Sequence, residues 1–402
     1  MNILVVHPVL SRLNSFGACE ADRMQNIRDL VRYGHQVHLL TRRAVHTPAA
    51  QIMALYEQLG VQSIVLVEPK RERSMRRWIH PALLDGAAWT YADPPFQTSL
   101  RQQIDRIRPD LIWCHGSYLW PVIQGARPVP TVVRSVNFES QSFLEERSPT
   151  LPNRLRSFAK ALGEAQAVRA SVLAAITPDE AHIYRRLNPQ STIEVLPLRA
   201  LPMVLREPVA QSEISPLRVF SMGASYNIEH NRAQLEFIAR EIVPRIRQAA
   251  SGQFEFHIMG SKVPPELLAL AADDLIFDGY VEDIDAHLAG MHIALSPRLY
   301  GTGMQQKVFE PLARGFPVVT HCKALAGYPF IAGEDCLIAE DANSFASALL
   351  ELRSTERRRM LGQNAYNRSV ELFSRERMDR TVHQILELAI DNAGAQFRHR
   401  IP

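Results

Sequence analysis

The sequence has little of what marks several large classes of protein. Its four cysteines are scattered and show no metal-ligand spacing, which indicates reduced thiols in a cytoplasmic protein: Cys19, Cys114, Cys322 and Cys336. No apolar run reaches the roughly 18 to 20 residues that a membrane-spanning helix needs. A net charge of +3 over 402 residues is too small to indicate a nucleic-acid partner.

Two motifs are also missing at strand ends. The loop after the first expected strand, Ile3–His7, contains Gly17 but no Gly-x-Gly-x-x-Gly fingerprint, which argues against an enzyme that uses a nicotinamide cofactor. No Asp-x-Asp metal motif stands at the end of a strand. The residues Asn2–Val6 follow no basic region, so we expect a buried strand here and no signal peptide.

The length and the alternation of apolar and helical segments predict two α/β domains. Residues Pro197–Pro216 contain four prolines and little periodicity, and form the expected linker. The expected strands are Ile3–His7, Gln36–Leu40, Val61–Val67, Asp110–Cys114, Thr131–Val133, Ala175–Thr177 and Ile193–Leu196, then Arg218–Met222, Glu255–Met259, Ile276–Phe277, Ile293–Ser296, Pro317–Thr320 and Cys336–Ile338. The expected helices include Glu20–Tyr33, Arg154–Ala174, Asn231–Gln248, Pro265–Ala272, Ile284–Leu288, Met304–Arg314, Ala342–Leu352, Glu356–Phe373 and Arg375–Asn392.

The segment Ser296–Val319 is the most informative part of the chain. It consists of a strand end, the loop Gly301-Thr302-Gly303, a helix that we expect to begin at Met304, and a further strand. A helix that follows such a loop points free N–H groups and the positive end of its dipole at one place, which favours a phosphate or diphosphate. Lys307 lies in the first turn and Glu310 three residues later, so a cation for phosphate and a carboxylate for hydroxyls are both at hand.

This segment resembles the donor-binding segment of retaining glycosyltransferases of family 4, because the helix with its glutamate is followed by the motif Ala313-Arg314-Gly315-Phe316-Pro317-Val318-Val319. The resemblance covers almost the whole chain and is stronger in the second half. It implies the GT-B fold, in which two doubly wound Rossmann-like domains face each other across a cleft. It places an acceptor-side domain at residues 1–200, a nucleotide-sugar domain at 201–374, and a last helix at 375–402 that packs back onto the first domain.

In the second domain the resemblance implies that Glu310 binds the nucleotide ribose and that Lys307 contacts phosphate. Arg298, at the preceding strand end, either neutralises the leaving diphosphate or pairs with an acid. The loop Gly301–Gly303 with Met304 is expected to hold the diphosphate and sugar through backbone N–H groups. Thr302 stands where many relatives have a first glutamate, and the loop after Gly223 lacks their arginine and lysine, although Gly223 would still allow close approach. In that loop Asn231 is a candidate helix cap, and Arg232 is a candidate source of positive charge for the diphosphate.

In the first domain the resemblance points to His115, after the strand Asp110–Cys114, as a residue near the anomeric carbon. Gly17 corresponds to a glycine-rich turn close to donor and acceptor, although any tight turn uses glycine. Glu139 either contacts the acceptor or caps the following helix, and we favour the cap. The basic run Lys70–Ile79 is either a solvated segment or a contact with an anionic membrane, which charge reversal at Arg71, Arg73, Arg76 and Arg77 would distinguish by liposome binding.

The resemblance therefore implies an enzyme: a retaining, metal-independent glycosyltransferase that uses no cofactor besides its nucleotide-diphosphate sugar donor. Its expected acceptor is a glycan or lipid-linked precursor in polysaccharide or glycoconjugate biosynthesis. We expect a cytoplasmic location, with peripheral contact at the inner face of the membrane as an open alternative, and no nucleic acid. Two other functions stay open, namely a nucleotide-sugar epimerase of the same fold and a non-catalytic glycosyltransferase-like subunit that binds a partner.

Overall fold

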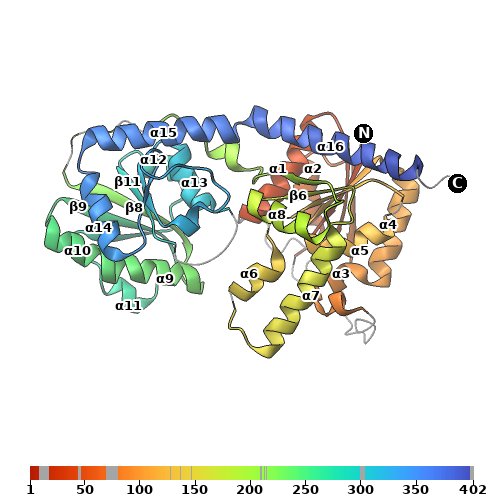
Figure 1. Ribbon diagram of the computed structural model, residues 1–402, viewed down its shortest axis with the longest axis horizontal. Coiled ribbons are helices and arrows are strands. Elements are labelled where there is room, and N and C mark those ends of the chain that lie inside the picture. Colours follow the sequence, from red (N-terminus) through yellow and green to blue (C-terminus); the bar gives the residue numbers. More distant parts are fainter. Residues whose placement is uncertain are drawn as a thin grey trace. The chain divides into compact units, whose positions relative to one another are not determined.

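The computed structural model describes residues 1–8, 18–43, 47–68, 80–126, 128–135, 137–145, 147–208, 211, 213, 215–298 and 304–398. The chain divides into two compact units (Figure 1). Unit 1 comprises Met1–Ala200 and Arg375–Pro402, and unit 2 comprises Leu201–Ser374. Each unit is a parallel sheet covered by helices, so the α/β class expected from the alternating pattern is confirmed.

The sheet of unit 1 has the strand order β3-β2-β1-β4-β5-β6-β7, and every strand pairs in parallel with its neighbours. The order reverses between β1 and β4, and this switch point is where doubly wound sheets bind ligands. The strands are β1 (Asn2–His7), β2 (Gln36–Arg42), β3 (Ser63–Val67), β4 (Leu111–His115), β5 (Thr131–Arg134), β6 (Val172–Ala175) and β7 (Ile193–Val195).

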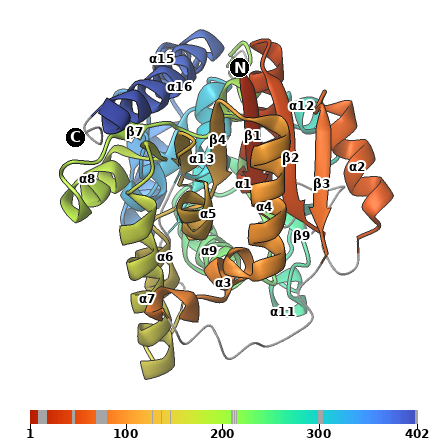
Figure 2. The same cartoon turned by 90° about the vertical axis from the view of Figure 1, so that its right-hand side faces the viewer.

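Helices cover both faces of this sheet. Successive side chains along a strand point to opposite faces, so each strand contributes to two separate cores. Along β1, Ile3 and Val5 belong to one core, while Leu4 and Val6 belong to the other. Figure 2 shows α4 in front of the strands. The helices of this unit are α1 (Ala18–Arg32), α2 (Ala49–Gln58), α3 (Gly86–Ala92), α4 (Pro94–Ile107), α5 (Trp120–Gly125), α6 (Glu139–Glu145), α7 (Leu151–Ala167), α8 (Pro178–Leu187) and α16 (Arg375–Arg398).

The last helix, α16, belongs to the core of unit 1 although it is nearly 200 residues from β7 in the sequence (Figure 1). Its residues Val382, Ile385 and Leu386 are buried with Ile3 and Trp113 of the central strands. The side chain of Asn392 donates to the carbonyl of Ser171 (3.0 Å). The C-terminal segment is thus an integral part of this unit.

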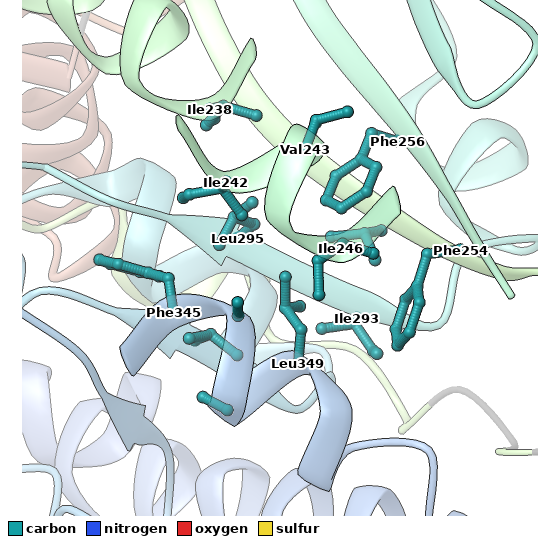
Figure 3. Packing of buried hydrophobic residues seen from close by; sticks show 14 of the residues in the cluster. Ile238, Ile242, Val243, Ile246, Phe254, Phe256, Ile293, Leu295, Phe345 and Leu349 are labelled. Atoms are coloured by element: carbon teal, nitrogen blue, oxygen red, sulfur yellow. The ribbon is translucent and has the colours of Figure 1, made fainter. Parts of the chain in front are cut away.

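Unit 2 repeats the same topology, with strand order β10-β9-β8-β11-β12-β13 and a reversal between β8 and β11. Its strands are β8 (Leu217–Ser225), β9 (Phe254–Ser261), β10 (Leu275–Gly279), β11 (Ile293–Ser296), β12 (Val318–Thr320) and β13 (Leu337–Ile338). Its helices are α9 (Glu229–Phe237), α10 (Val243–Ala249), α11 (Pro265–Leu268), α12 (Ile284–Leu288), α13 (Gln306–Ala313), α14 (Ala342–Glu351) and α15 (Thr355–Phe373). Figure 3 shows its core, where residues of α10 and α14 pack on Phe256, Ile293 and Leu295 of the sheet.

Several helix boundaries differ from the sequence prediction, and the expected helix Pro265–Ala272 already ends at Leu268. The expected helix Arg154–Ala174 runs from Leu151 to Ala167, and Val172–Ala175 is the strand β6. Short apolar runs such as this one fit a helix and a buried strand equally well. The expected helix Asn231–Gln248 is interrupted by a π-helical turn, Ile238–Ile242, because Pro244 has no N–H to continue the hydrogen-bond ladder.

Candidate active site

The predicted donor-binding residues that the structure describes lie at the carboxyl ends of β8 and β11, where the strand order of unit 2 reverses. Arg298 follows β11, and Lys307 lies in the first turn of α13. Helix α13 begins at Gln306, so Met304 precedes the helix that was expected to begin there, and its side chain is buried. Gln305 gives the first turn no side-chain cap, which leaves N–H groups there for another acceptor. The predicted residues Gly301, Thr302 and Gly303 lie outside the described residues.

Lys307 is held beside the loop that follows β8. Its Nζ donates to Oδ1 of Asn231 (3.0 Å), and the Asn231 amide donates in turn to the carbonyl of Ser225 (2.9 Å). Asn231 is therefore a partner of Lys307 and not the cap of α9 that was considered for it. Sequence reasoning missed this pair because 76 residues separate the two positions.

Positive charge is concentrated at this point. Burial, reinforced by the charge of Arg298, lowers the pKa of Lys307 to about 8. The pKa of His230 is lowered by burial and then by Arg298 and Lys307. Arg232 does not join this group, because it pairs with Glu236 (3.0 Å) and Glu266 (2.8 Å). Cations that disfavour one another in the free protein gain most when an anion binds among them.

Glu310 lies on the same helix, and its carboxylate is held by Arg314. Its Oε1 accepts from Nε (3.2 Å) and Nη2 (2.9 Å) of Arg314, one turn later. Arg314 in turn donates through Nη1 to Oδ1 of Asp285 on α12 (2.5 Å). The carboxylate is thus oriented before any ligand arrives, and within the described part of the chain its second oxygen has no assigned hydrogen bond.

Gly223 has a role in packing. A Cβ added to Gly223 would lie 2.1 Å from the hydroxyl oxygen of Tyr226 and 2.5 Å from the Met259 carbonyl oxygen. Tyr226 donates to that carbonyl (2.8 Å) and is buried beneath the loop. A larger residue at this position would therefore displace Tyr226 or the chain around it. The close approach of Gly223 to a ligand stays a prediction.

In unit 1, His115 ends β4 and lies beside the switch point with β1. Its ring packs edge-on against His7 at the end of β1, with 5.0 Å between centroids. The Asn26 amide on α1 bonds His115 Nε2 (3.0 Å), and burial, followed by the charge of His7 and nearby arginines, places the pKa of His115 well below its usual range. The ring is therefore neutral, with Nε2 as acceptor and the proton on Nδ1. Nδ1 is buried and has no hydrogen-bond partner among the described residues.

A buried ionic network holds Asn26, the hydrogen-bond partner of this histidine, in place. Arg199 donates to Oδ1 of Asn26 (3.0 Å) and to Asp29 (2.5 Å), so the Asn26 amide is left with its N–H₂ toward the ring. Arg134 pairs with Asp22 (3.3 Å), which also accepts from the Arg199 backbone (2.6 Å). The sequence pattern gave no signal for Asn26, Arg199 or His7.

The remaining sequence predictions have different outcomes. Glu139 begins α6 but does not cap it, because the buried Glu164 of α7 accepts from the Glu139 N–H (2.5 Å). The side chain of Glu139 pairs with Lys160 (3.3 Å). Gly17 and the basic run Lys70–Ile79 lie outside the described residues. Within the described chain, side chains with metal-ligand spacing gather at His257, Asp278 and His287 and not around α13.

A groove of about 510 Å³ lies between α6 and α7. It is lined by Ser140, Gln141, Leu144, Arg154, Ser157, Phe158 and Ala161. Along α7, Leu151, Leu155 and Phe158 form an apolar stripe that is 57 to 72% exposed. None of the described helices has the length and hydrophobicity required to cross a bilayer.

Comparisons with known proteins agree with this geometry. Residues 218–355, which include both switch-point strands and α13, match the family model of glycosyl transferases group 1. No curated protein matches the chain.

Solved structures with a similar fold include sucrose-phosphate synthase from Thermosynechococcus elongatus, with a TM-score of 0.67 at 16% identity over 96% of this chain and 98% of that one. Anabaena HepE in complex with UDP and glucose gives 0.61 at 14%, over 96% and 99%. A variant of S. aureus TarM in complex with Fondaparinux, alpha-GlcNAc-glycerol and UDP gives 0.67 at 11%, over 97% and 100%.

The fold is therefore the one seen in GT-B glycosyltransferases, and residues 218–355 match the family model of glycosyl transferases group 1. This confirms the resemblance stated from the segment Ser296–Val319 at the level of group 1 and of the fold.

Proposed function

We propose that this protein is a retaining glycosyltransferase of family 4 that transfers a sugar from a nucleotide-diphosphate sugar to an acceptor hydroxyl. One observation carries the proposal: Lys307 lies in the first turn of α13 at the switch point of unit 2, where the charge of Arg298 is close enough to lower its pKa. Such a place favours a diphosphate. The solved complexes of HepE and TarM contain UDP, which supports a nucleotide diphosphate as the leaving group.

In this proposal the protein acts mainly on charge that develops as the sugar leaves. The bond between the anomeric carbon and the diphosphate oxygen breaks, and the acceptor oxygen bonds to the same carbon on the same face while its proton is released. Lys307, Arg298 and the N–H groups at the start of α13 stabilise the negative charge on the diphosphate, which is usually the largest catalytic contribution. We propose that these groups do so without a divalent metal.

Two further side chains orient the donor. Glu310, already aligned by Arg314, accepts hydrogen bonds from the ribose hydroxyls. His115 serves at the sugar through Nδ1–H, a buried ring atom that has no hydrogen-bond partner among the described residues. A buried donor that lacks a partner loses about 1 to 3 kcal/mol, which a substrate hydroxyl can restore.

The surface of α6 and α7 supports a lipid-linked acceptor and peripheral contact with a membrane. The exposed stripe of Leu151, Leu155 and Phe158 lies beside the exposed Arg147, Arg154 and Arg156. Apolar side chains flanked by arginines are what an anionic lipid surface binds. We therefore propose that the protein acts at the cytoplasmic face of a membrane, in the synthesis of a polysaccharide or glycoconjugate.

The proposal is tested by nucleotide release from a panel of UDP-, GDP- and dTDP-sugars, with the wild type and Glu310→Ala side by side. Slow release from one donor, reduced in the variant, supports a glycosyltransferase and identifies its donor. Conversion of a donor to another sugar nucleotide without release would support an epimerase. Absence of both release and binding would leave the non-catalytic subunit.

A further inference from the structure

A second polar cluster in unit 2 plays no part in the proposed transfer. His257 lies in the middle of β9, Asp278 is in β10, and His287 is in the last turn of α12. His257 faces away from the core that its neighbours Phe256 and Ile258 enter. One ligand atom from each of the three side chains lies within 4.8 Å of the other two.

His257 lies between two carboxylates. Its Nε2 is 2.6 Å from Oε1 of Glu255, and its Nδ1 is 3.1 Å from Oδ1 of Asp278. When Nε2–H donates to Glu255, the lone pair of Nδ1 is free to bind a metal ion beside Asp278. A carboxylate on the far nitrogen is the arrangement that orients metal-binding histidines and raises their basicity.

Asp278 and His287 form the other side of the cluster. Oδ2 of Asp278 and Nε2 of His287 are 3.4 Å apart, and both atoms are buried without a hydrogen-bond partner in the described part of the chain. With its proton on Nδ1, the His287 ring presents a lone pair at Nε2. Two imidazole nitrogens and one carboxylate therefore converge on one point, where a metal ion can bind all three.

We propose that His257, Asp278 and His287 bind a divalent transition-metal ion of the zinc class, with Glu255 as the carboxylate that orients His257. Zn–N and Zn–O bonds of about 2.0 to 2.2 Å in a tetrahedron place neighbouring ligand atoms about 3.3 to 3.5 Å apart. Nδ1 of His257 and Nε2 of His287 lie 3.1 and 3.4 Å from the two oxygens of the Asp278 carboxylate, so small side-chain adjustments bring all three groups to this spacing. Two imidazoles and one carboxylate suit zinc better than the harder magnesium or calcium. Water completes the fourth position, because the His287 side chain is 23% exposed.

Such an ion would join a helix to two paired strands of the sheet. It ties α12 to β9 and β10, and α12 also carries Asp285, which holds Arg314 against Glu310. The role is therefore structural and separate from the departure of the diphosphate. It stands whether or not the proposed transfer is correct.

The test uses the untagged full-length protein, freed of metal with a chelator and titrated with Co²⁺ and then Zn²⁺. We expect one equivalent of Co²⁺ to give the visible absorption of a tetrahedral site with nitrogen and oxygen ligands, and Zn²⁺ to displace it. His287→Ala and Asp278→Asn should abolish the absorption, and Glu255→Gln should weaken Zn²⁺ affinity by about 10- to 100-fold. His182→Ala, an exposed histidine on α8, is the matched control and should bind as the wild type does.

Thermal melting with and without Zn²⁺ separates loss of the site from loss of the fold. The wild type should melt at a higher temperature with Zn²⁺, because an ion that binds only the folded state stabilises it. His287→Ala, folded by circular dichroism, should show no such shift. The proposal is overturned if the wild type gives no tetrahedral Co²⁺ spectrum, or if the His287 and Asp278 variants bind as tightly as it does.

Discussion

The ammonium group of Lys307 should make donor binding depend on pH. Its pKa of about 8 in the free protein means that the group loses its charge as the pH rises through 8, and a neutral amine attracts a diphosphate poorly. We predict that affinity for the nucleoside diphosphate of the donor falls by up to about tenfold per pH unit above this value. Isothermal titration calorimetry between pH 6.5 and 9.5 measures the profile.

Two variants distinguish the charge of Lys307 from its packing. Lys307→Met retains the length of the side chain and should bind weakly with a flat profile in this range. Lys307→Arg keeps the charge above pH 9, so its affinity should no longer fall there. An unchanged profile in Lys307→Met would refute the assignment of this residue to the diphosphate.

The tautomer of His115 gives a second prediction for a single residue. Asn26 donates to Nε2 and thereby keeps the proton on Nδ1, where it can reach a substrate hydroxyl. Asn26→Asp presents an acceptor to the same nitrogen, so we expect the proton to shift to Nε2 and kcat to fall by about 10- to 100-fold. The ¹⁵N shifts of the ring report the tautomer directly. Loss of activity without a change in tautomer would mean that Asn26 acts through Arg199 instead.

At the scale of elements, α6 and α7 should mediate membrane contact. Leu155→Glu and Phe158→Glu place a carboxylate in the exposed apolar stripe, and we expect each to reduce binding to anionic liposomes several-fold, since both burial and charge then oppose it. Co-sedimentation measures binding. Leu187→Glu on α8, at a leucine that is also exposed, is the control and should bind normally. Equal binding by all variants would exclude this surface.

Elements also show what the sequence could and could not predict. The two strands and the helix expected within Ser296–Val319 are confirmed, because apolar runs and helical periodicity are local signals. The end of α7 was wrong by seven residues, since Val172–Ala175 fits a helix or a buried strand and only pairing with β5 decides. The contact between Asn231 and Lys307 could not be predicted from the sequence for a similar reason. It depends on which strands are neighbours in the sheet, because their ends then lie together.

At the scale of the whole molecule, the two units have separate hydrophobic cores, and one of them is completed by the last segment of the chain. The resemblance to family 4 implies that this last helix packs back onto the first domain, although it directly follows unit 2 in the sequence. The apolar residues Val382, Ile385 and Leu386 of α16 lie in a core of unit 1 that they share with residues of β1, β4, α1 and α2. Stability of unit 1 therefore depends on residues that follow unit 2 in the sequence.

This arrangement predicts that one substitution and one ligand act on different halves of the molecule. Ile385→Ala removes a fully buried side chain and should destabilise unit 1 by about 2 to 5 kcal/mol, while Ile390→Ala on the same helix, 36% exposed, should cost far less. The donor nucleotide should stabilise unit 2, because Lys307, Glu310 and Asn231 all belong to it. Differential scanning calorimetry should resolve a transition that Ile385→Ala lowers and another that the nucleotide raises. A single transition that both changes shift equally would show that the units unfold together, and that α16 couples them more strongly than their separate cores imply.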